Sequence, residues 1–413
     1  MAFAAQSLSE RAHPGVPMST LLATLGTALA GPALLLGGTY PGYGTLAGPT
    51  VPATVEAAVA ASDPAPETGG AVRFNDPSGG RSRQFTLVRR IDRAIRGADA
   101  GATVRLAAYS FAMPSTAQAL LAAHARGAQV QVVVDDHSSH WGAVRRLRDR
   151  LGTDTSAASF VKVCRLSCRG GRGNQHAKFV TVSSGSMGDD LVMVGSLNLT
   201  NFSSQRQWND LYVASDRGAH DQLVDVFRRL ADDRPQGRLA VRETSKGFET
   251  DLAPYTTGAG GDPIKRRLDR VRCQGTSLLS GRNGRTVVRV AMHAWNGDRG
   301  IDLARRVARL HRRGCDVKVL YGVGMGRAVA TILRTSGVPV RDSNNNGRRV
   351  HHKVMVLSGV LGSQIDANYV WTGSHNWSDR SLRNDEIMFR IAGRHLVQAY
   401  LANFRTMWRA AAR

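Results

Sequence analysis

Lysine and cysteine are both scarce in this chain of 413 residues. Six of its 55 cationic side chains are lysine and the others are arginine, and no basic tract with interleaved aromatic residues stands out. The charge alone therefore does not predict specific recognition of nucleic acid. The four cysteines form no Cys-x-x-Cys pair and no cluster with histidine, so the sequence does not support a structural zinc site.

Long apolar runs are also scarce. The clearest run, Leu21–Leu36, is short and is interrupted by Gly and Pro, which is typical of a signal-peptide core rather than a membrane-spanning helix. We expect residues 1–36 to be a signal peptide, cleaved near Ala30 or as late as residue 60, and the protein to be secreted. An uncleaved membrane anchor is the alternative. Residues 37–72, rich in Pro, Ala and Gly, are expected to be a disordered linker.

Acidic residues are few beside the basic ones. The chain has 32 acidic and 55 basic side chains, which gives a formal charge of +23 and a pI of about 11.1. This balance predicts an anionic partner, either a phospholipid membrane or cell surface or a nucleic acid. The alternative is that arginine is spread over the whole surface and reflects genome composition. The apolar fraction of 42% is that of a globular protein with a core.

The four cysteines fit an exported protein, because disulfides form and persist outside the cytosol. Four cysteines allow three pairings. The most local pairing joins Cys164 to Cys168 and Cys273 to Cys315. A metal site is the rival use of these side chains, although the spacing gives it no support.

The most informative feature is a set of motifs that occurs once in each half. The first copy is His176-Ala-Lys178 with Gly195-Ser-Leu-Asn198, and the second is His351-His-Lys353 with Gly373-Ser-His-Asn376. Each His-x-Lys lies in a β-like run, where side chains at i and i+2 point to the same face. The histidine and lysine of each copy therefore project together. A duplicated imidazole, cation and amide suits chemistry on a phosphodiester.

This pattern resembles the phospholipase D superfamily, and the resemblance covers the chain from about Arg73 onward. In that family the paired motifs meet across a pseudo-twofold axis in one active site that needs no cofactor and no metal. The resemblance implies that one of His176 and His351 attacks phosphorus and forms a phosphohistidine. The other protonates the leaving alkoxide and then deprotonates water or an alcohol. On resemblance alone His176 is the nucleophile and His351 the acid and base, and the opposite assignment stays open.

The resemblance also gives roles to the other polar residues of the motifs. Lys178 and Lys353 would offset negative charge on the phosphate oxygens. The motif amides would donate hydrogen bonds to the same oxygens, with the motif serines beside them. These amides and serines are Asn198, Asn376, Ser196 and Ser374.

A nucleophilic histidine also needs a partner on its second ring nitrogen to fix the tautomer. The family uses a downstream carboxylate for this purpose. We expect Asp210 in the first half and Glu386 in the second, with Asp385 as the alternative to Glu386. The chain departs from the family at Ser183 and Ser358, where the family motif has an aspartate whose role we take to be structural.

The two halves match beyond these motifs. Each has the pattern helix, strand, helix, strand, motif strand, Gly-Ser-x-Asn strand and C-terminal helix, and a shared His-x-Arg-Gly at 124–127 and 311–314 predicts a helix end. The pattern predicts an α/β fold of two α/β/α sandwich lobes with mixed sheets, related by a pseudo-twofold axis and sharing one active site. We expect the lobes at 73–235 and 263–413, joined by a linker at 236–262.

The sequence therefore predicts a secreted, monomeric, metal-independent phosphodiesterase similar to bacterial phospholipase D. Such an enzyme would cleave a glycerophospholipid to phosphatidic acid and a free head group, or transfer the phosphatidyl group to another alcohol. The first alternative is a metal-independent nuclease of the same superfamily, which the basic charge favours. The second is an inactive, secreted polyanion-binding protein on the same scaffold.

Overall fold

The computed structural model describes most of the chain after residue 68, and the described residues are 69–169, 172–234, 242–243, 249–253 and 261–411. The expected signal peptide, its cleavage sites and most of the expected linker at 37–72 lie outside these residues. None of the helices in the described part of the chain combines the length and hydropathy of a membrane span.

The first lobe is built on a seven-stranded mixed sheet in the order β1-β8-β6-β5-β2-β3-β4. β2, β3 and β4 run parallel, and the other neighbours in the sheet are antiparallel. The strands are β1 (Ala71–Phe74), β2 (Thr103–Ala108), β3 (Gln129–Asp135), β4 (Phe160–Cys164), β5 (Phe179–Val182), β6 (Leu191–Gly195) and β8 (Asp210–Ser215). The helices are α1 (Arg81–Gln84), α2 (Thr86–Arg96), α3 (Pro114–Ala125), η1 (Asp136–Ser138), α4 (Gly142–Leu151), α5 (Asn201–Arg206) and α6 (Arg217–Ala231).

Both faces of this sheet are covered by helices. Val132 and Val134 of β3 pack in one apolar cluster with α2, α3 and α4, whereas Val133 packs in another with Phe227 of α6. Because neighbouring residues of a strand point to opposite faces, these two clusters lie on opposite sides of the sheet. The first lobe is therefore an α/β/α sandwich.

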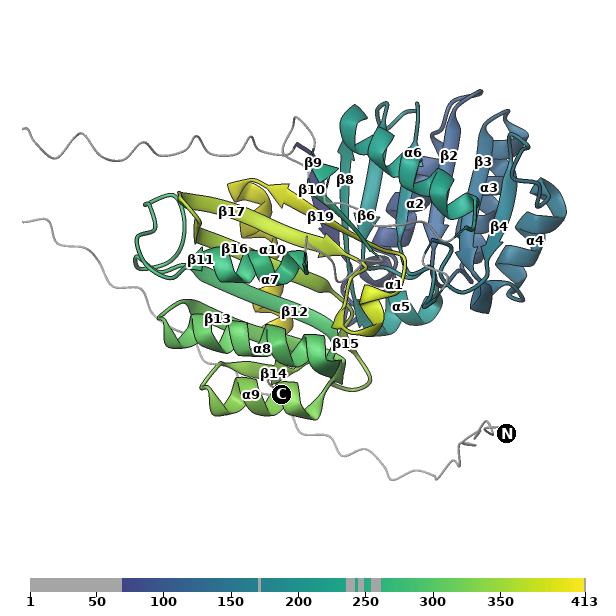
Figure 1. Cartoon of the computed structure of the whole chain (residues 1–413). Helices are drawn as coiled ribbons and strands as arrows, with labels where there is room; N and C mark the ends of the chain where they lie inside the picture. Colours follow the sequence, from purple (N-terminus) through teal and green to yellow (C-terminus); the bar gives the residue numbers. More distant parts are fainter. Residues whose placement is uncertain (1–68, 170–171, 235–241, 244–248, 254–260, 412–413) are drawn as a thin grey trace, which may run out of the picture. The chain divides into compact units, whose positions relative to one another are not determined.

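The second lobe repeats this plan in a sheet with the order β14-β13-β12-β16-β17-β19-β10-β9 (Figure 1). Its main strands are β9 (Arg242–Glu243), β10 (Glu249–Ala253), β12 (Val287–Asn296), β13 (Asp316–Met325), β14 (Val340–Asp342), β16 (Lys353–Leu361), β17 (Gln364–Gly373) and β19 (Glu386–Ala392). Its helices are α7 (Pro263–Arg270), α8 (Gly297–Arg312), α9 (Arg327–Thr335), η2 (Arg380–Leu382) and α10 (Arg394–Ala410). The second lobe also has the short strands β11 (Val271–Arg272), β15 (Arg349–Val350) and β18 (Trp377–Ser378), and the first lobe has the short strand β7 (Gln207–Trp208). The predicted two-lobed α/β fold is confirmed.

One apolar cluster is shared by the two lobes. It joins Tyr212 and Phe227 of the first lobe to Phe389 and Phe404 of the second, all buried. Two further clusters lie under α2–α4 and under α7–α9. A continuous apolar layer between two lobes holds them in one arrangement, since separating them would expose it to water.

The expected linker at 236–262 contributes to the second sheet. β10 pairs antiparallel with β19, and β9 pairs with β10. Glycine and threonine around this strand have the composition of a loop, so the sequence pattern predicts no strand at this place. The first lobe likewise begins at β1, two residues before the expected boundary at residue 73.

The shared His-x-Arg-Gly ends a helix in each lobe, as predicted. α3 ends at Ala125 and α8 at Arg312, and the glycines that follow, Gly127 and Gly314, have φ values of 96° and 91°. Only glycine adopts this left-handed conformation at little cost, and it allows the chain to turn from the helix into the next strand.

The most local cysteine pairing is present. Cys164 is joined to Cys168 within the first lobe, and Cys273 to Cys315 within the second.

The longer disulfide is expected to carry a measurable part of the stability. Cys273 and Cys315 are 42 residues apart in the sequence. Replacing both by serine should lower the free energy of unfolding by about 4 kcal/mol, because the cross-link restricts the unfolded chain. The Cys164→Ser/Cys168→Ser pair closes a much shorter loop and should cost about half as much. Urea unfolding of both variants checks this, and equal losses would contradict it.

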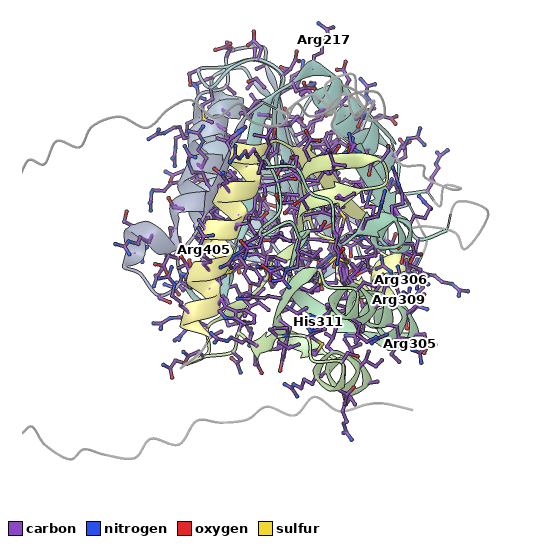
Figure 2. The ribbon with its side chains drawn as sticks, turned by 90° about the vertical axis from the view of Figure 1, so that its left-hand side faces the viewer. Arg217, Arg305, Arg306, Arg309, His311 and Arg405 are labelled. Carbon is purple, nitrogen blue, oxygen red and sulfur yellow. A yellow bond between two sulfur atoms is a disulfide. The ribbon has the colours of Figure 1, made fainter. Side chains whose placement is uncertain are left out.

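The positive charge is distributed over both lobes. Figure 2 labels Arg217 at the start of α6, Arg305, Arg306 and Arg309 along α8, and Arg405 on α10. All but Arg306 of these are exposed. These arginines therefore lie on both lobes.

Candidate active site

The two motif histidines lie where the lobes meet, and each is tied to the opposite lobe through its backbone. The amide of His176 donates to the carbonyl of Asp385 at 3.0 Å, and the amide of His351 donates to the carbonyl of Trp208 at 3.0 Å. Short parallel contacts precede both residues, between Gln175 and Asp385 and between β15 and β7. Each lobe therefore donates an equivalent backbone hydrogen bond to the other, as a pseudo-twofold axis requires.

Each imidazole also receives a side-chain partner from the other lobe. The Nδ1 atom of His176 lies 2.8 Å from Oε2 of Glu386, and the Nδ1 atom of His351 lies 2.8 Å from Oδ1 of Asn209. The Nδ2 atom of Asn209 donates to two backbone carbonyls, so its Oδ1 atom faces the ring as an acceptor. Both histidines therefore carry a proton on Nδ1 and keep Nε2 for chemistry.

Asp210 does not orient a histidine, in contrast to the prediction. Its carboxylate accepts hydrogen bonds from the hydroxyls of Ser196, Thr372 and Tyr400. Adjacent residues on a strand face opposite sides, and here Asn209 is the one that faces His351. The sequences Asn209-Asp210 and Asn384-Asp385 look equivalent, but the register of the strands shows that they are not. Gly195 pairs with Leu211 and Gly373 pairs with Met388, so the residue equivalent to Glu386 is Asn209.

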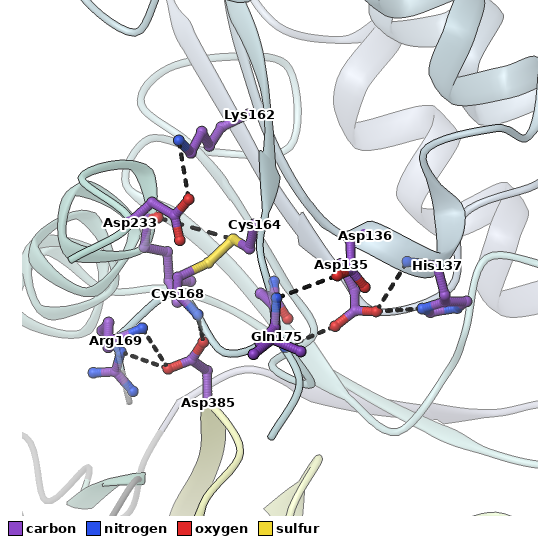
Figure 3. The surroundings of a disulfide bond; sticks show 12 residues. Asp135, Asp136, His137, Lys162, Cys164, Cys168, Arg169, Gln175, Asp233 and Asp385 are labelled. Carbon is purple, nitrogen blue, oxygen red and sulfur yellow. Dashed lines mark hydrogen bonds and ion pairs between the residues drawn. A yellow bond between two sulfur atoms is a disulfide. The ribbon is translucent and has the colours of Figure 1, made fainter. Parts of the chain in front are cut away.

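In the second half, Glu386 faces the site and Asp385 faces away from it. Asp385 accepts from the backbone amides of Cys168 and Arg169 at 2.6 and 3.2 Å, and from Nε of Arg169 at 3.3 Å (Figure 3). Burial raises the pKa of Asp385 to about 6, although Arg169 acts in the opposite direction. The disulfide-closed loop at 164–168 therefore holds the residue next to Glu386.

Ser196 and Ser374, which are expected beside the phosphate, bond to buried carboxylates. Both are fully buried. The hydroxyl of Ser196 donates to Asp210 at 2.7 Å, and the hydroxyl of Ser374 donates to Glu386 at 2.5 Å. They therefore hold the carboxylates in place, and their position beside a bound phosphate stays a prediction.

The two lysines lie beside their histidines as predicted, although neither histidine lies in a strand, since β5 begins at Phe179 and β16 at Lys353. Nζ of Lys178 donates to the carbonyl of His176 at 2.6 Å. Nζ of Lys353 donates to the carbonyl of His351 at 2.7 Å and lies 3.0 Å from its Nε2 atom. Burial lowers the pKa of Lys178 to about 7, and burial together with Lys178 lowers that of Lys353 well below its usual value. An anionic ligand would restore both charges by compensating the cost of burial.

Burial also dominates the electrostatics of the imidazoles. It lowers the pKa of His176 to about 4, even though Glu386 acts in the opposite direction. For His351, burial lowers the pKa well below its usual value, and Lys353 and His293 beside it act in the same direction. Burial would raise the pKa of Glu386, but the charges and hydrogen bond around it prevail and lower it to about 2. The free site thus holds neutral imidazoles and an ionised Glu386.

The two motif amides differ in their surroundings. Oδ1 of Asn376 accepts from the amide of Ala294 at 3.2 Å, and Oδ1 of Asn198 is buried without a hydrogen-bond partner. Among the described residues neither amide bonds to a motif histidine or lysine. Their assignment to phosphate binding stays a prediction.

Sequence reasoning missed two residues that flank the histidines. Tyr109 follows β2 and its ring centroid lies 4.8 Å from that of His176, while His293 lies at the matching position in β12 and 4.6 Å from His351. Nδ1 of His293 lies 3.1 Å from a backbone carbonyl, and burial and Lys353 lower the pKa of His293 to about 3. Their place at the carboxyl ends of equivalent parallel strands is the signal that could have found them.

Ser183 and Ser358, which replace the family aspartate, make structural contacts. The hydroxyl of Ser183 accepts from the amide of Thr103 at 2.8 Å, and that of Ser358 accepts from the amide of Gly281 at 3.0 Å. Each hydroxyl supplies the acceptor that a backbone amide beside the motif strand needs.

One group of residues within the described ranges has the spacing of a metal site. It consists of Cys164, Cys168 and Asp233. Both sulfurs are joined in the disulfide, and Asp233 pairs with Lys162 at 3.1 Å, so the group offers no free thiolate (Figure 3).

Residues 91–231 and 283–408 match the family described as cardiolipin synthase, PLD-like domain. The two segments cover more than half of the chain, and each contains one copy of the paired motifs.

Two curated proteins are similar to part of the chain. Over 111 residues it is 34% identical to the mitochondrial cardiolipin hydrolase of Xenopus tropicalis and 32% identical to that of Xenopus laevis. Each match covers 26% of this chain and 48% of the relative. The chain therefore spans about half the length of the curated relatives it matches.

Two solved structures share the fold over most of the chain. The phosphatidylserine synthase of Haemophilus influenzae Rd KW20 aligns with a TM-score of 0.55 and 14% identity, over 82% of this chain and 86% of that one. The polyphosphate kinase of Porphyromonas gingivalis aligns with a TM-score of 0.53 and 14% identity, over 82% and 50%. At this identity the likeness concerns the fold alone.

Proposed function

The chain belongs to the phospholipase D-like phosphodiesterase superfamily, and from this premise we propose that it is a secreted phospholipase D. It would hydrolyse glycerophospholipids to phosphatidic acid and a free head group, or transfer the phosphatidyl group to an alcohol. The observation that carries this proposal is the pair of buried imidazoles whose Nδ1 atoms are held by side chains of the opposite lobes, at 2.8 Å in both cases. One chain supplies both halves of this site, so a monomer suffices.

In the proposed reaction, Nε2 of His176 forms a bond to phosphorus while the bond to the leaving alcohol breaks. Binding of the anionic phosphate favours the form of His351 that is protonated on both ring nitrogens, and its Nε2 atom then gives a proton to the departing oxygen. Neutral His351 then takes a proton from water or an alcohol, whose oxygen attacks phosphorus and releases His176. Lys178 and Lys353 offset charge on the phosphate oxygens throughout, so the scheme requires no metal.

The unequal partners of the two rings favour this assignment of roles. A ring phosphorylated on Nε2 and protonated on Nδ1 is cationic, and the ionised Glu386 stabilises that charge on His176. His351 is bonded instead to the neutral Asn209, which leaves its protonated form less stable and its proton easier to transfer. The more basic ring is the better nucleophile, and the less basic ring is the stronger acid.

Lipid is favoured over nucleic acid as the substrate by the relatives named as cardiolipin hydrolases. An anionic membrane surface attracts a strongly basic protein, so the formal charge of +23 suits a lipid substrate.

A nuclease is the second candidate, and one contact near the site favours it. Phe202 is 48% exposed, and the guanidinium of Arg349, two residues before His351, lies 4.9 Å from the centre of its ring. An exposed aromatic ring beside an arginine can stack a base of single-stranded nucleic acid.

Parallel assays separate the two candidates. The purified protein, with EDTA present, is given phosphatidylcholine vesicles in one arm and single- and double-stranded DNA in the other, with His351→Ala as the control in both. We expect choline release that disappears in the variant. DNA cleavage without choline release would replace the lipid proposal by the nuclease. Loss of activity on chelation would contradict the metal-independent scheme, and no cleavage in either arm would leave only polyanion binding.

Asn209→Asp is expected to move the alkaline limb of the pH profile of kcat/KM to higher pH by about one to two units. A carboxylate on Nδ1 favours the protonated ring and raises the pKa of His351, which is held well below its usual value in the wild type. The first step needs this proton, which is present below the pKa and lost as pH rises through it. A raised pKa therefore extends activity towards alkaline pH.

Asn201→Asp is the matched control, because Asn201 is exposed at the start of α5 and the variant adds the same charge. Thermal unfolding of both variants is needed, since Asn209→Asp also removes two Nδ2 hydrogen bonds. A limb that stays in place, or moves to lower pH, in a folded Asn209→Asp protein contradicts the role given to His351.

A further inference from the structure

A loop of the first lobe is closed by the Cys164–Cys168 disulfide and holds a carboxylate of the second lobe, that of Asp385 (Figure 3). The backbone amides of Cys168 and Arg169 donate to its two oxygens at 2.6 and 3.2 Å, and Nε of Arg169 lies 3.3 Å from one of them. The side chain of Ser167 bonds to the same carboxylate. The side chains of Arg169 and Asp385 are fully buried. This polar contact therefore joins the two lobes in the interior of the protein.

Asp385 is also the residue through which the second lobe reaches His176. The amide of His176 donates to the carbonyl of Asp385 at 3.0 Å, and the amide of Asp385 donates to the carbonyl of Asn174 at 2.9 Å. Oε2 of the next residue, Glu386, lies 2.8 Å from Nδ1 of His176. A displacement of Asp385 would therefore move both the backbone that holds His176 and the carboxylate that orients its ring.

The pseudo-symmetric equivalent of Asp385 is Trp208, and its surroundings differ. By the register of the strands the two residues correspond, and the carbonyl of Trp208 accepts from the amide of His351. The side chain of Trp208 is apolar and packs in the cluster shared by the two lobes. Within the described ranges, therefore, a disulfide-closed loop supports only the histidine that is proposed as the nucleophile.

A buried carboxylate is costly to keep, and the loop offsets this cost. Burial raises the pKa of Asp385 to about 6, although Arg169, Ser167 and the loop amides act in the opposite direction. These groups can hold the carboxylate together only while the loop is ordered. The disulfide joins residues four positions apart and so restricts the loop to few conformations. Without it, the gain in conformational entropy favours a loop that has left the carboxylate.

We propose that the Cys164–Cys168 loop and Asp385 position His176 for its attack on phosphorus, so that turnover depends on this disulfide. This inference rests on the proposed covalent mechanism and adds positioning residues to it. Asp385 acts through its neighbours, because it fixes the backbone of His176 and the side chain of Glu386. Loss of this order reduces the fraction of molecules in which Nε2 of His176 faces phosphorus, which lowers kcat more than it raises KM.

The test compares the two disulfides of the protein. Cys164→Ser/Cys168→Ser should lower kcat on bis(p-nitrophenyl) phosphate, a soluble phosphodiester, by about ten- to a hundredfold, since a small misplacement of a reacting group costs this much. The change in KM should be smaller. Cys273→Ser/Cys315→Ser is the matched control, because Cys315 precedes β13 at its amino end, away from the site at the carboxyl ends of the parallel strands.

The control should keep kcat within about twofold of the wild type at a temperature where it is folded. It is nevertheless the variant that is expected to lose more stability, because its disulfide closes the longer loop. A loss of activity that merely followed stability would therefore appear in the opposite order.

Hydrogen exchange gives a second readout that needs no activity. The backbone amides of residues 174–176 are all hydrogen-bonded, two of them to the second lobe. Mass spectrometry should show faster exchange at these amides in Cys164→Ser/Cys168→Ser and unchanged exchange in the control. If the first variant does not fold, Asp385→Asn should show the same changes in kcat and exchange, because an amide side chain offers one acceptor oxygen instead of two.

Unchanged kcat in folded Cys164→Ser/Cys168→Ser, or unchanged exchange at residues 174–176, would overturn the proposal. An equal loss of kcat in the two double variants would overturn it as well, since the disulfides would then act through stability alone. If the wild type cleaves no phosphodiester, the proposed mechanism fails, and hydrogen exchange still decides whether the loop positions His176.

Discussion

Replacing either His176 or His351 by alanine is expected to lower turnover of a phosphodiester by about 10⁴-fold or more, because each step needs one nucleophile and one proton carrier. The two losses should not add in the double variant, since the residues act on the same phosphorus atom. Initial rates on phosphatidylcholine, with circular dichroism and thermal unfolding of each variant, check this.

His140→Ala is the control for this experiment, because it removes an exposed histidine of the first lobe that takes no part in the scheme. It should retain the wild-type rate. Substantial turnover in a folded His176→Ala or His351→Ala protein would mean that the lobes do not share one site.

Glu386→Gln is expected to lower turnover by about two to three orders of magnitude with little change in KM. The amide can keep one hydrogen bond to Nδ1 of His176, but it carries no charge to stabilise the phosphorylated, cationic ring. It can also present its NH₂ group to Nδ1 and so favour the wrong tautomer. The variant thus separates the electrostatic role of Glu386 from its size.

Glu249→Gln is a matched control for Glu386→Gln. Glu249 is also a largely buried carboxylate of the second lobe, and it pairs with Arg267 and Arg390 rather than with a histidine. It should lower the free energy of unfolding and leave turnover of the folded protein unchanged. If the two variants lose activity equally, the carboxylate at Glu386 has only a structural role.

The local signals in the sequence predicted much of this structure. The spacing of His176 and Lys178 predicted that their side chains lie together, although both precede β5, and the duplicated motifs predicted that the second pair lies beside the first. The His-x-Arg-Gly glycines ended two helices, and the most local cysteine pairing formed. These features depend on residues a few positions apart or on repetition, which a single sequence displays.

Contacts between the lobes could not be predicted in the same way. Asp210 and Asn209 are neighbours, and only the register of β8 decides which of them faces His351. A shift of one residue in the register exchanges the two faces of a strand. Similar residues in the two halves therefore do not show which side chain faces the active site. For the same reason the sequence does not predict the hydrogen bond from Ser374 to Glu386.

Residues without a repeated motif were also missed. Tyr109 and His293 occupy equivalent positions but share no chemistry that would reveal the equivalence. His137 is brought to Ser110 by the parallel pairing of β2 and β3, across 27 positions of sequence. Such contacts follow from the sheet order, which the alternation of strands and helices does not determine.

The most direct test of the account is to find where the substrate becomes covalently attached. Phosphatidyl-p-nitrophenol has a leaving group that needs no proton, so His351→Ala should release one equivalent of nitrophenol and then stop for lack of a base. Peptide mass spectrometry after a neutral quench should then place the phosphatidyl group on His176. A burst in His176→Ala with the adduct on His351 would reverse the roles, and steady release without an adduct on either histidine would contradict the shared covalent mechanism.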